Sequence, residues 1–256
     1  MIFFRAEAEL SKLNGSGDGI ASEPESGPAA YGPDNQYRSL TQILVSSLRD
    51  RIFAGTYKPG GRLNIADLAQ QFNVSPVPLR EALRNLEAEG LVEFRLNRGV
   101  VVRELSSAEV RELYLMRVPL ETLVAVEATQ RASSEQLNHL EAILFDMDSV
   151  FGTERWHVLH DRFHREFYAF SGLPRAAQLV EVLRGQMRPY SRTFLENRGH
   201  LSAAQSEHYA LIEAARERDT DKIRSIILQH LKRPAEIAMS AVGAPPATTN
   251  SAPSPS

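Results

Sequence analysis

Four histidines in the second half of the chain occupy positions where helical periodicity turns them inward. His160 and His164 are four residues apart on one predicted helix, while His208 and His230 lie on two later ones, each among apolar neighbours. Imidazoles that converge from facing helices are typical ligands of Zn²⁺ or a similar divalent metal. Taken singly, each is more often a hydrogen-bonded core residue than a ligand. His139, His157 and His200 are expected at the surface.

A second group of chemically useful residues lies in the stretch V-S-P-V-P-L-R-E-A-L-R-N-L, where Arg80 and Arg84 are one helical turn apart. Between residues 37 and 105 the chain has ten Lys and Arg against seven Asp and Glu. This net +3 contrasts with a formal charge of −3 for the whole chain. The segment is therefore suited to an anionic partner.

The prolines of this stretch start a helix rather than break one. Ser75 is a suitable N-cap, which places Pro76 and Pro78 in the first turn, where backbone N–H groups have no intrahelical partner. The helix then turns Leu79, Ala82, Leu83 and Leu86 inward and ends at Gly90.

Two apolar-periodic helices precede this one, at about 38–54 and 65–72. A short alternating hairpin, V-E-F-R-L to V-V-V-R, follows it. This order predicts a winged helix-turn-helix over residues 37–104, a DNA-binding fold. The alternative is a small structural α+β domain. Residues 1–36, rich in Gly, Ser and Pro, are predicted to be a disordered leader.

Beyond the wing the pattern is helical, so the fold is mainly α and ends in an all-helical bundle over residues 105–241. Capping boxes are expected at Ser106, Ser133 and Ser202, and Thr220 is expected to cap the last helix. Pro119 and Pro189 are expected to kink or divide their helices, which gives six or seven helices in all. Residues 242–256 are predicted to be a disordered tail.

Two stretches resemble a known family. V-S-P-V-P-L-R-E-A-L-R-N-L-E-A-E-G-L-V with N-R-G-V-V-V resembles the winged helix of GntR-type bacterial regulators. F-H-R-E-F-Y-A-F-S-G and E-H-Y-A-L-I-E-A-A-R-E-R-D resemble the FCD effector domain of the FadR-like branch. The resemblance covers residues 38–240. It implies a homodimer that places two recognition helices in successive major grooves of a palindromic operator.

The resemblance also implies roles for single residues in DNA binding. Ser75 and Arg80 match DNA-contacting positions, and Gly99 matches the wing glycine; Arg84 and Arg98 are further candidates. Pro76 and Ala66 depart from the family, because they stand where many or some members carry an arginine that contacts DNA. We therefore expect a base preference different from that of relatives.

For the bundle, the resemblance implies a divalent metal held by one Asp and three His. His164, His208 and His230 match the three histidines, but His160 stands at the Asp position and Asp161 is displaced by one. Either His160 replaces the carboxylate or Asp161 reaches the metal. The metal expected is Zn²⁺.

Effectors implied by the resemblance are small carboxylates, for which arginine is a bidentate partner. Arg117 matches a position often used in this way, and Arg188 and Arg192 are further candidates. Alternatively, Arg117 forms an ion pair with Glu121, four residues on.

The leading interpretation is a DNA-binding transcriptional regulator, expected to be a repressor, whose operator affinity is controlled by a small organic acid. The alternative is an all-helical metalloenzyme that carries a DNA-binding module, although H-E-x-x-H and G-x-S-x-G motifs are absent. A third possibility is an architectural DNA-binding protein. The chain has no cysteine and no long apolar run, so we expect a cytoplasmic protein, associated with the nucleoid when bound to DNA, and no membrane partner.

Overall fold

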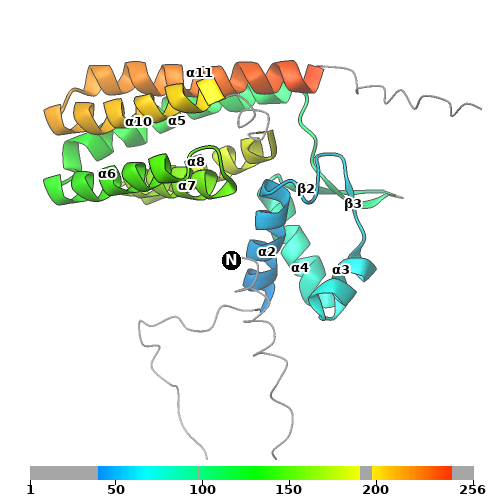
Figure 1. Ribbon diagram of the computed structural model, residues 1–256. Helices are drawn as coiled ribbons and strands as arrows, with labels where there is room; N and C mark the ends of the chain where they lie inside the picture. Colours follow the sequence, from blue (N-terminus) through cyan, green and yellow to red (C-terminus); the bar gives the residue numbers. More distant parts are fainter. Residues whose placement is uncertain (1–39, 97, 191–197, 244–256) are drawn as a thin grey trace, which may run out of the picture. The chain divides into compact units, whose positions relative to one another are not determined.

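The computed structural model describes residues 40–96, 98–190 and 198–243. The chain divides between Glu104 and Leu105 into two compact units (Figure 1). The leader predicted over 1–36, and the part of the predicted tail from residue 244 onward, lie outside the described residues. In the part that is described, no helix is long and apolar enough to cross a bilayer.

The N-terminal unit is a winged helix-turn-helix, as predicted. Its elements are α2 (Leu40–Phe53), β1 (Arg62–Leu63), α3 (Ile65–Phe72), α4 (Pro76–Ala88), β2 (Val92–Arg95) and β3 (Gly99–Val102). The sheet is antiparallel in the order β1-β3-β2. Strand β1 is an addition to the predicted hairpin, because two residues are too few to show alternation.

Helix α4 begins where the prolines predict. Ser75 has an extended backbone (φ −69°, ψ 158°) and Pro76 is the first helical residue, but the serine hydroxyl makes no capping hydrogen bond. The apolar side of the helix is fully buried at Leu79, Leu83 and Leu86. Because this side packs against α2 and α3, the opposite side of α4 faces solvent.

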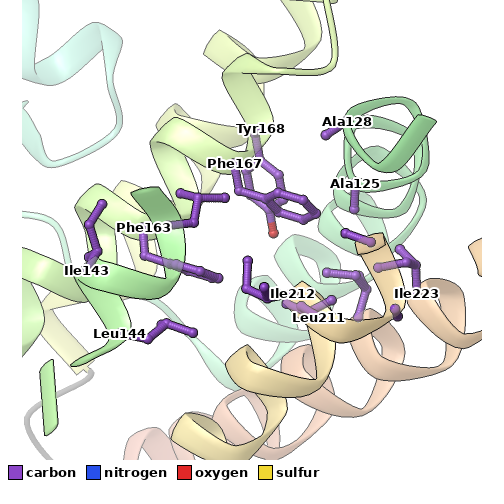
Figure 2. Close-up of a cluster of buried hydrophobic side chains, with 14 of the residues drawn as sticks. Ala125, Ala128, Ile143, Leu144, Phe163, Phe167, Tyr168, Leu211, Ile212 and Ile223 are labelled. Atoms are coloured by element: carbon purple, nitrogen blue, oxygen red, sulfur yellow. The ribbon is translucent and has the colours of Figure 1, made fainter. Parts of the chain in front are cut away.

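The C-terminal unit is helical throughout its described residues. It comprises α5 (Ser107–Arg131), α6 (Ser134–Ser149), α7 (Glu154–Ala169), α8 (Pro174–Met187), the 3₁₀ turn η1 (Arg188–Tyr190), α10 (Arg198–Glu217) and α11 (Thr220–Gly243). Helix α11 packs along α5 and α10 (Figure 1). In the core, aromatic residues of α7 lie with Leu211 and Ile212 of α10 and Ala125 of α5 (Figure 2).

The capping predictions were partly correct. Ser106 and Ser133 form complete capping boxes with Glu109 and Gln136. The prediction for Ser202 was wrong, because α10 already begins at Arg198.

At the start of α11, the side chain of Asp219 accepts a hydrogen bond from the backbone N–H of Lys222 at 2.9 Å, so Asp219 caps this helix and Thr220 does not.

The proline predictions need a similar correction. Helix α5 runs undivided through Pro119, whose side chain is exposed, so water can satisfy the carbonyl that lacks its helical N–H donor. Pro189 does mark a change, since it lies in the 3₁₀ turn that follows α8. Pro234 lies inside α11 and was not anticipated.

Candidate metal centre, ligand cavity and DNA-binding face

The four inward histidines meet inside the helical unit. His160 and His164 come from α7, His208 from α10 and His230 from α11, and one ligand atom from each lies within 4.8 Å of all the others. His164 and His208 are fully buried and His230 nearly so. Three helices that are far apart in sequence therefore build one cluster.

The spacing within the cluster fits a metal ion. The Nε2 atoms of His164 and His208 are 3.2 Å apart. Two ligands of a tetrahedral site with Zn–N bonds of about 2.0–2.1 Å would be about 3.4 Å apart. The Nδ1 atoms of His164 and His208 have no hydrogen-bond partner among the described residues, whereas Nδ1 of His230 contacts Glu207 at 2.8 Å.

Burial keeps three of these imidazoles, those of His160, His164 and His208, uncharged. It lowers the pKa of His160 to about 3, helped by the positive charge of Arg184 and opposed by Asp161. Burial likewise places the pKa values of His164 and His208 well below the ordinary value. A neutral imidazole keeps the lone pair that a metal requires, so the donor set fits a divalent cation at neutral pH.

Asp161 is engaged by arginines. Its carboxylate forms ion pairs with Arg188 and, at 3.6 Å, with Arg184. Burial would raise the pKa of Asp161, but the nearby His160 ring, 3.7 Å away, and the arginine charges hold it well below its usual range. The histidine cluster within 4.8 Å contains His160 and does not contain Asp161.

Trp156, one turn before His160, fixes the position of that histidine ring. The two rings are stacked, with centroids 5.0 Å apart and planes inclined by 17°. Trp156 is almost fully buried. Both residues also line a cavity beside the histidine cluster, so a ligand in that cavity would contact both rings.

A cavity of about 100 Å³ adjoins the cluster. His160 and His230 line it, together with Arg117, Arg184 and Arg188. The remaining wall is largely apolar, with contributions from Leu231, Pro234, Ile237 and Ala238 of α11. The cavity therefore combines a cationic side with an apolar side, which suits a small amphiphilic anion.

Arg117 forms the expected ion pair with Glu121 and also lies at the cavity. Its Nε donates to the fully buried Glu121 at 2.7 Å, and the residue also lines the cavity. Glu121 further accepts from the Tyr168 hydroxyl at 2.7 Å and lies 3.4 Å from Arg184. Arg117, Arg184 and Arg188 thus face two buried carboxylates, Glu121 and Asp161, and Arg184 also lies 3.9 Å from the partly exposed Glu181.

Several outcomes differ from the sequence predictions. Arg192 lies outside the described residues. His157, expected at the surface, is half-buried and lines the cavity, whereas His139 is exposed and contacts Glu166 at 2.7 Å.

Arg184 was missed. The signal available was its position four residues after Val180 and four before Arg188, which places it on the inner side of α8. Glu207 was also missed, and its only signal was its place next to His208.

The DNA-binding candidates lie on the solvent side of the N-terminal unit. Ser75 and Arg80 are exposed, and Arg80 makes no ion pair or hydrogen bond among the described residues. Arg84 pairs with Glu87 at 2.7 Å and stacks on the ring of Phe94, with its guanidinium 3.9 Å from the ring centroid.

In the wing, Arg98 and Gly99 are exposed, and Gly99 has a φ of 73°. A positive φ of this kind favours glycine, so the tight turn into β3 depends on that residue.

Comparisons with known proteins agree with this architecture. Residues 40–102 match the model of the gntR family of bacterial regulatory proteins, and residues 112–233 match the FCD domain. The HTH-type transcriptional regulator YdhC of Bacillus subtilis is 30% identical over 198 residues, which cover 75% of this chain and 88% of that protein. The HTH-type transcriptional repressor RspR of Escherichia coli is 26% identical over 208 residues, which cover 79% and 90%.

Among solved structures, Escherichia coli McbR/YncC superposes with a TM-score of 0.72 at 22% identity, covering 80% of this chain and 99% of that one. A GntR regulator from Rhodococcus sp. RHA1 gives a TM-score of 0.65 at 21% identity, covering 78% and 98%. At this identity the superpositions show a shared fold.

Proposed function

The chain belongs to the gntR family of bacterial regulatory proteins and carries an FCD domain, and on this premise we propose that it is a metabolite-controlled repressor. Its relatives are transcriptional regulators. The chain is likewise a DNA-binding transcriptional regulator and not an enzyme. In the proposal, a small organic acid binds at a metal-centred cavity of the helical unit and changes operator affinity. The observation that carries the proposal is the convergence of four imidazoles beside an arginine-lined cavity.

On the DNA side, Arg80 is the residue proposed to read a base edge. It is exposed on the recognition helix α4 and is not engaged by another described side chain. Arginine offers a bidentate fork to guanine in the major groove. Ser75 and Arg98 are proposed to contact phosphates, and Gly99 is proposed to let the wing approach the DNA closely. Arg84, which stacks on Phe94, is proposed to support the contact on the wing side.

On the ligand side, His160, His164, His208 and His230 are proposed to hold one divalent metal, with Zn²⁺ preferred because imidazole suits it. When bound, this metal supplies a Lewis-acid centre for a carboxylate oxygen of the ligand. Arg188 and Arg117 would orient the acid, and the apolar wall of α11 would hold its carbon chain. The volume of about 100 Å³ restricts the acid to a small one.

Tyr190 offers a route from the cavity to the DNA-binding unit. Its ring lines the cavity, and its hydroxyl accepts a hydrogen bond from the backbone N–H of Leu105 at 2.6 Å. Leu105 directly follows Glu104, the last residue of the N-terminal unit. A ligand that displaces Tyr190 would therefore release the segment that joins the units, and the population of DNA-competent arrangements would shift. We further propose that the protein acts in the cytoplasm as a homodimer bound to a palindromic operator.

The test begins with selection of a binding site from a random double-stranded DNA library. The affinity for that site is then measured by anisotropy titration with metal-stripped and with Zn²⁺-loaded protein. Each form is tested with a panel of two- to six-carbon carboxylates. We expect at least one acid to weaken DNA binding tenfold or more in the loaded protein, and Arg188→Gln to reduce that response. DNA affinity that no acid changes would leave an architectural role and overturn the proposal.

A further inference from the structure

Glu207 is an acidic residue next to the histidine cluster that contacts one of its histidines closely. It immediately precedes His208 on α10, and its carboxylate Oε2 lies 2.8 Å from Nδ1 of His230 on α11. Only 14% of its side chain is exposed. Its second oxygen, Oε1, lies 3.2 Å from Arg233, one turn after His230 on α11.

We propose that Glu207 is a positioning residue for the metal centre, which holds His230 in the tautomer that presents Nε2 and supplies the negative charge that four imidazoles lack. This inference rests on the proposed metal site and goes beyond it, because it assigns a role to a residue outside the ligand set.

The first argument is geometric. A carboxylate that accepts a hydrogen bond from Nδ1–H fixes both the ring orientation and the tautomer of a histidine, which leaves Nε2 unprotonated for the metal. Nδ1 of His164 and of His208 has no such partner among the described residues. His230 is therefore the one of these three whose orientation is set by an anion.

The second argument concerns charge. With His160 in the cluster, four imidazole ligands bring no negative charge to a divalent ion inside a buried site, which is costly without a counter-charge. Asp161 is nearby, but its charge is matched by Arg188 and Arg184. Among the described residues, Glu207 has one arginine partner, Arg233, whose side chain is 28% exposed and so partly screened by water. Its charge thus remains available to the cluster through His230.

The competing role for Glu207 is a purely structural bridge between α10 and α11. The two roles predict different results. A bridge stabilises the metal-free fold, whereas a positioning residue acts mainly on metal affinity. Glu207→Gln separates them further, because its amide oxygen still accepts the hydrogen bond from Nδ1–H but carries no charge.

The experiment measures the Zn²⁺ dissociation constant by competition with a chromophoric chelator, and the melting temperature of the metal-free protein. Full-length wild type is compared with Glu207→Ala and Glu207→Gln. The matched control is Glu213→Ala, an exposed glutamate on the same helix. We expect Glu207→Ala to weaken Zn²⁺ binding about 10- to 100-fold, Glu207→Gln to lose less, and Glu213→Ala to match wild type.

Each other outcome is decisive. Unchanged Zn²⁺ affinity in Glu207→Ala, or a loss of affinity no larger than that of Glu213→Ala, would overturn the positioning role while leaving the metal site intact. A lower melting temperature of metal-free Glu207→Ala with wild-type Zn²⁺ affinity would establish the structural bridge instead. Wild-type protein that binds no Zn²⁺ would overturn the proposed metal centre, and the role of Glu207 with it.

Discussion

Asp161 forms an ion pair with Arg188, which links the middle of α7 to the turn that follows α8. Arg188 lies two residues before Tyr190, and both residues line the cavity. Asp161, which the family resemblance offers as an alternative to His160 as a metal ligand, is thus paired with arginines at the cavity. The proposed metal ligands and the arginines proposed to bind the anion are therefore different side chains, and the two proposals can be tested separately.

Arg80→Ala is expected to weaken specific operator binding by about 10- to 100-fold, the amount that one bidentate base contact contributes. The fold should persist, because Arg80 is exposed and unpaired among the described residues. Anisotropy on the selected operator measures the effect, with Arg80→Lys as the matched variant that keeps the charge but loses the fork. Wild-type affinity in Arg80→Ala would remove this residue from base readout.

Arg117→Ala is expected to destabilise the helical unit by about 3 kcal/mol, because it removes a partner of a buried ion pair. Burial would raise the pKa of Glu121, and the charges of Arg117 and Arg184 and the Tyr168 hydrogen bond keep it below its usual value. Urea unfolding measures the loss. The double variant Arg117→Met with Glu121→Gln should recover much of it, since no unpaired charge remains, and a double variant as unstable as Arg117→Ala would contradict the explanation.

The stability of the metal-free protein should fall as the pH drops below about 6.5, the ordinary histidine pKa. Below that pH the imidazole of residue 160 becomes protonated in the unfolded chain. In the folded protein the same imidazole stays neutral until the pH approaches its pKa of about 3. Since the unfolded state binds more protons, the free energy of unfolding decreases by up to about 1.4 kcal/mol per pH unit for each such histidine.

Urea unfolding at pH 7.0, 6.0 and 5.0 checks this dependence. His160→Gln should reduce the slope by about one proton relative to wild type. An unchanged slope in His160→Gln would show that this imidazole is not held neutral.

Tyr190→Phe keeps the ring at the cavity and removes the oxygen that accepts from Leu105. We expect Zn²⁺ affinity to be unchanged and the change in operator affinity that an active carboxylate causes in the Zn²⁺-loaded protein to shrink about two- to tenfold, the effect of one hydrogen bond. Anisotropy of the Zn²⁺-loaded protein with and without that acid measures both states, with Tyr114→Phe on α5 as the control. A full response in Tyr190→Phe would exclude this route.

Sequence alone predicted the parts of the molecule that depend on local periodicity. The inward positions of His160, His164, His208 and His230 follow from helical spacing, and the start of α4 follows from Ser75 and its prolines. Both depend on interactions within one helix, which a short stretch of sequence specifies.

The parts that escaped prediction depend on partners from other elements. The ion pairs of Arg184 involve α5 and α7, and the contact of Glu207 crosses from α10 to α11. Strand β1 exists because β3 pairs with it. Ser202 has the sequence of a cap but lies inside α10, where tertiary packing extends the helix past a local signal.

The most direct test of the central claim is the metal content of the purified protein, measured by elemental mass spectrometry before and after reconstitution with Zn²⁺. Wild type is compared with His208→Ala and with His139→Ala, which removes an exposed histidine outside the cluster. The account predicts about one metal per chain in wild type and His139→Ala, and its loss in His208→Ala. A wild type that stays metal-free after reconstitution, or equal metal in His208→Ala, would contradict it.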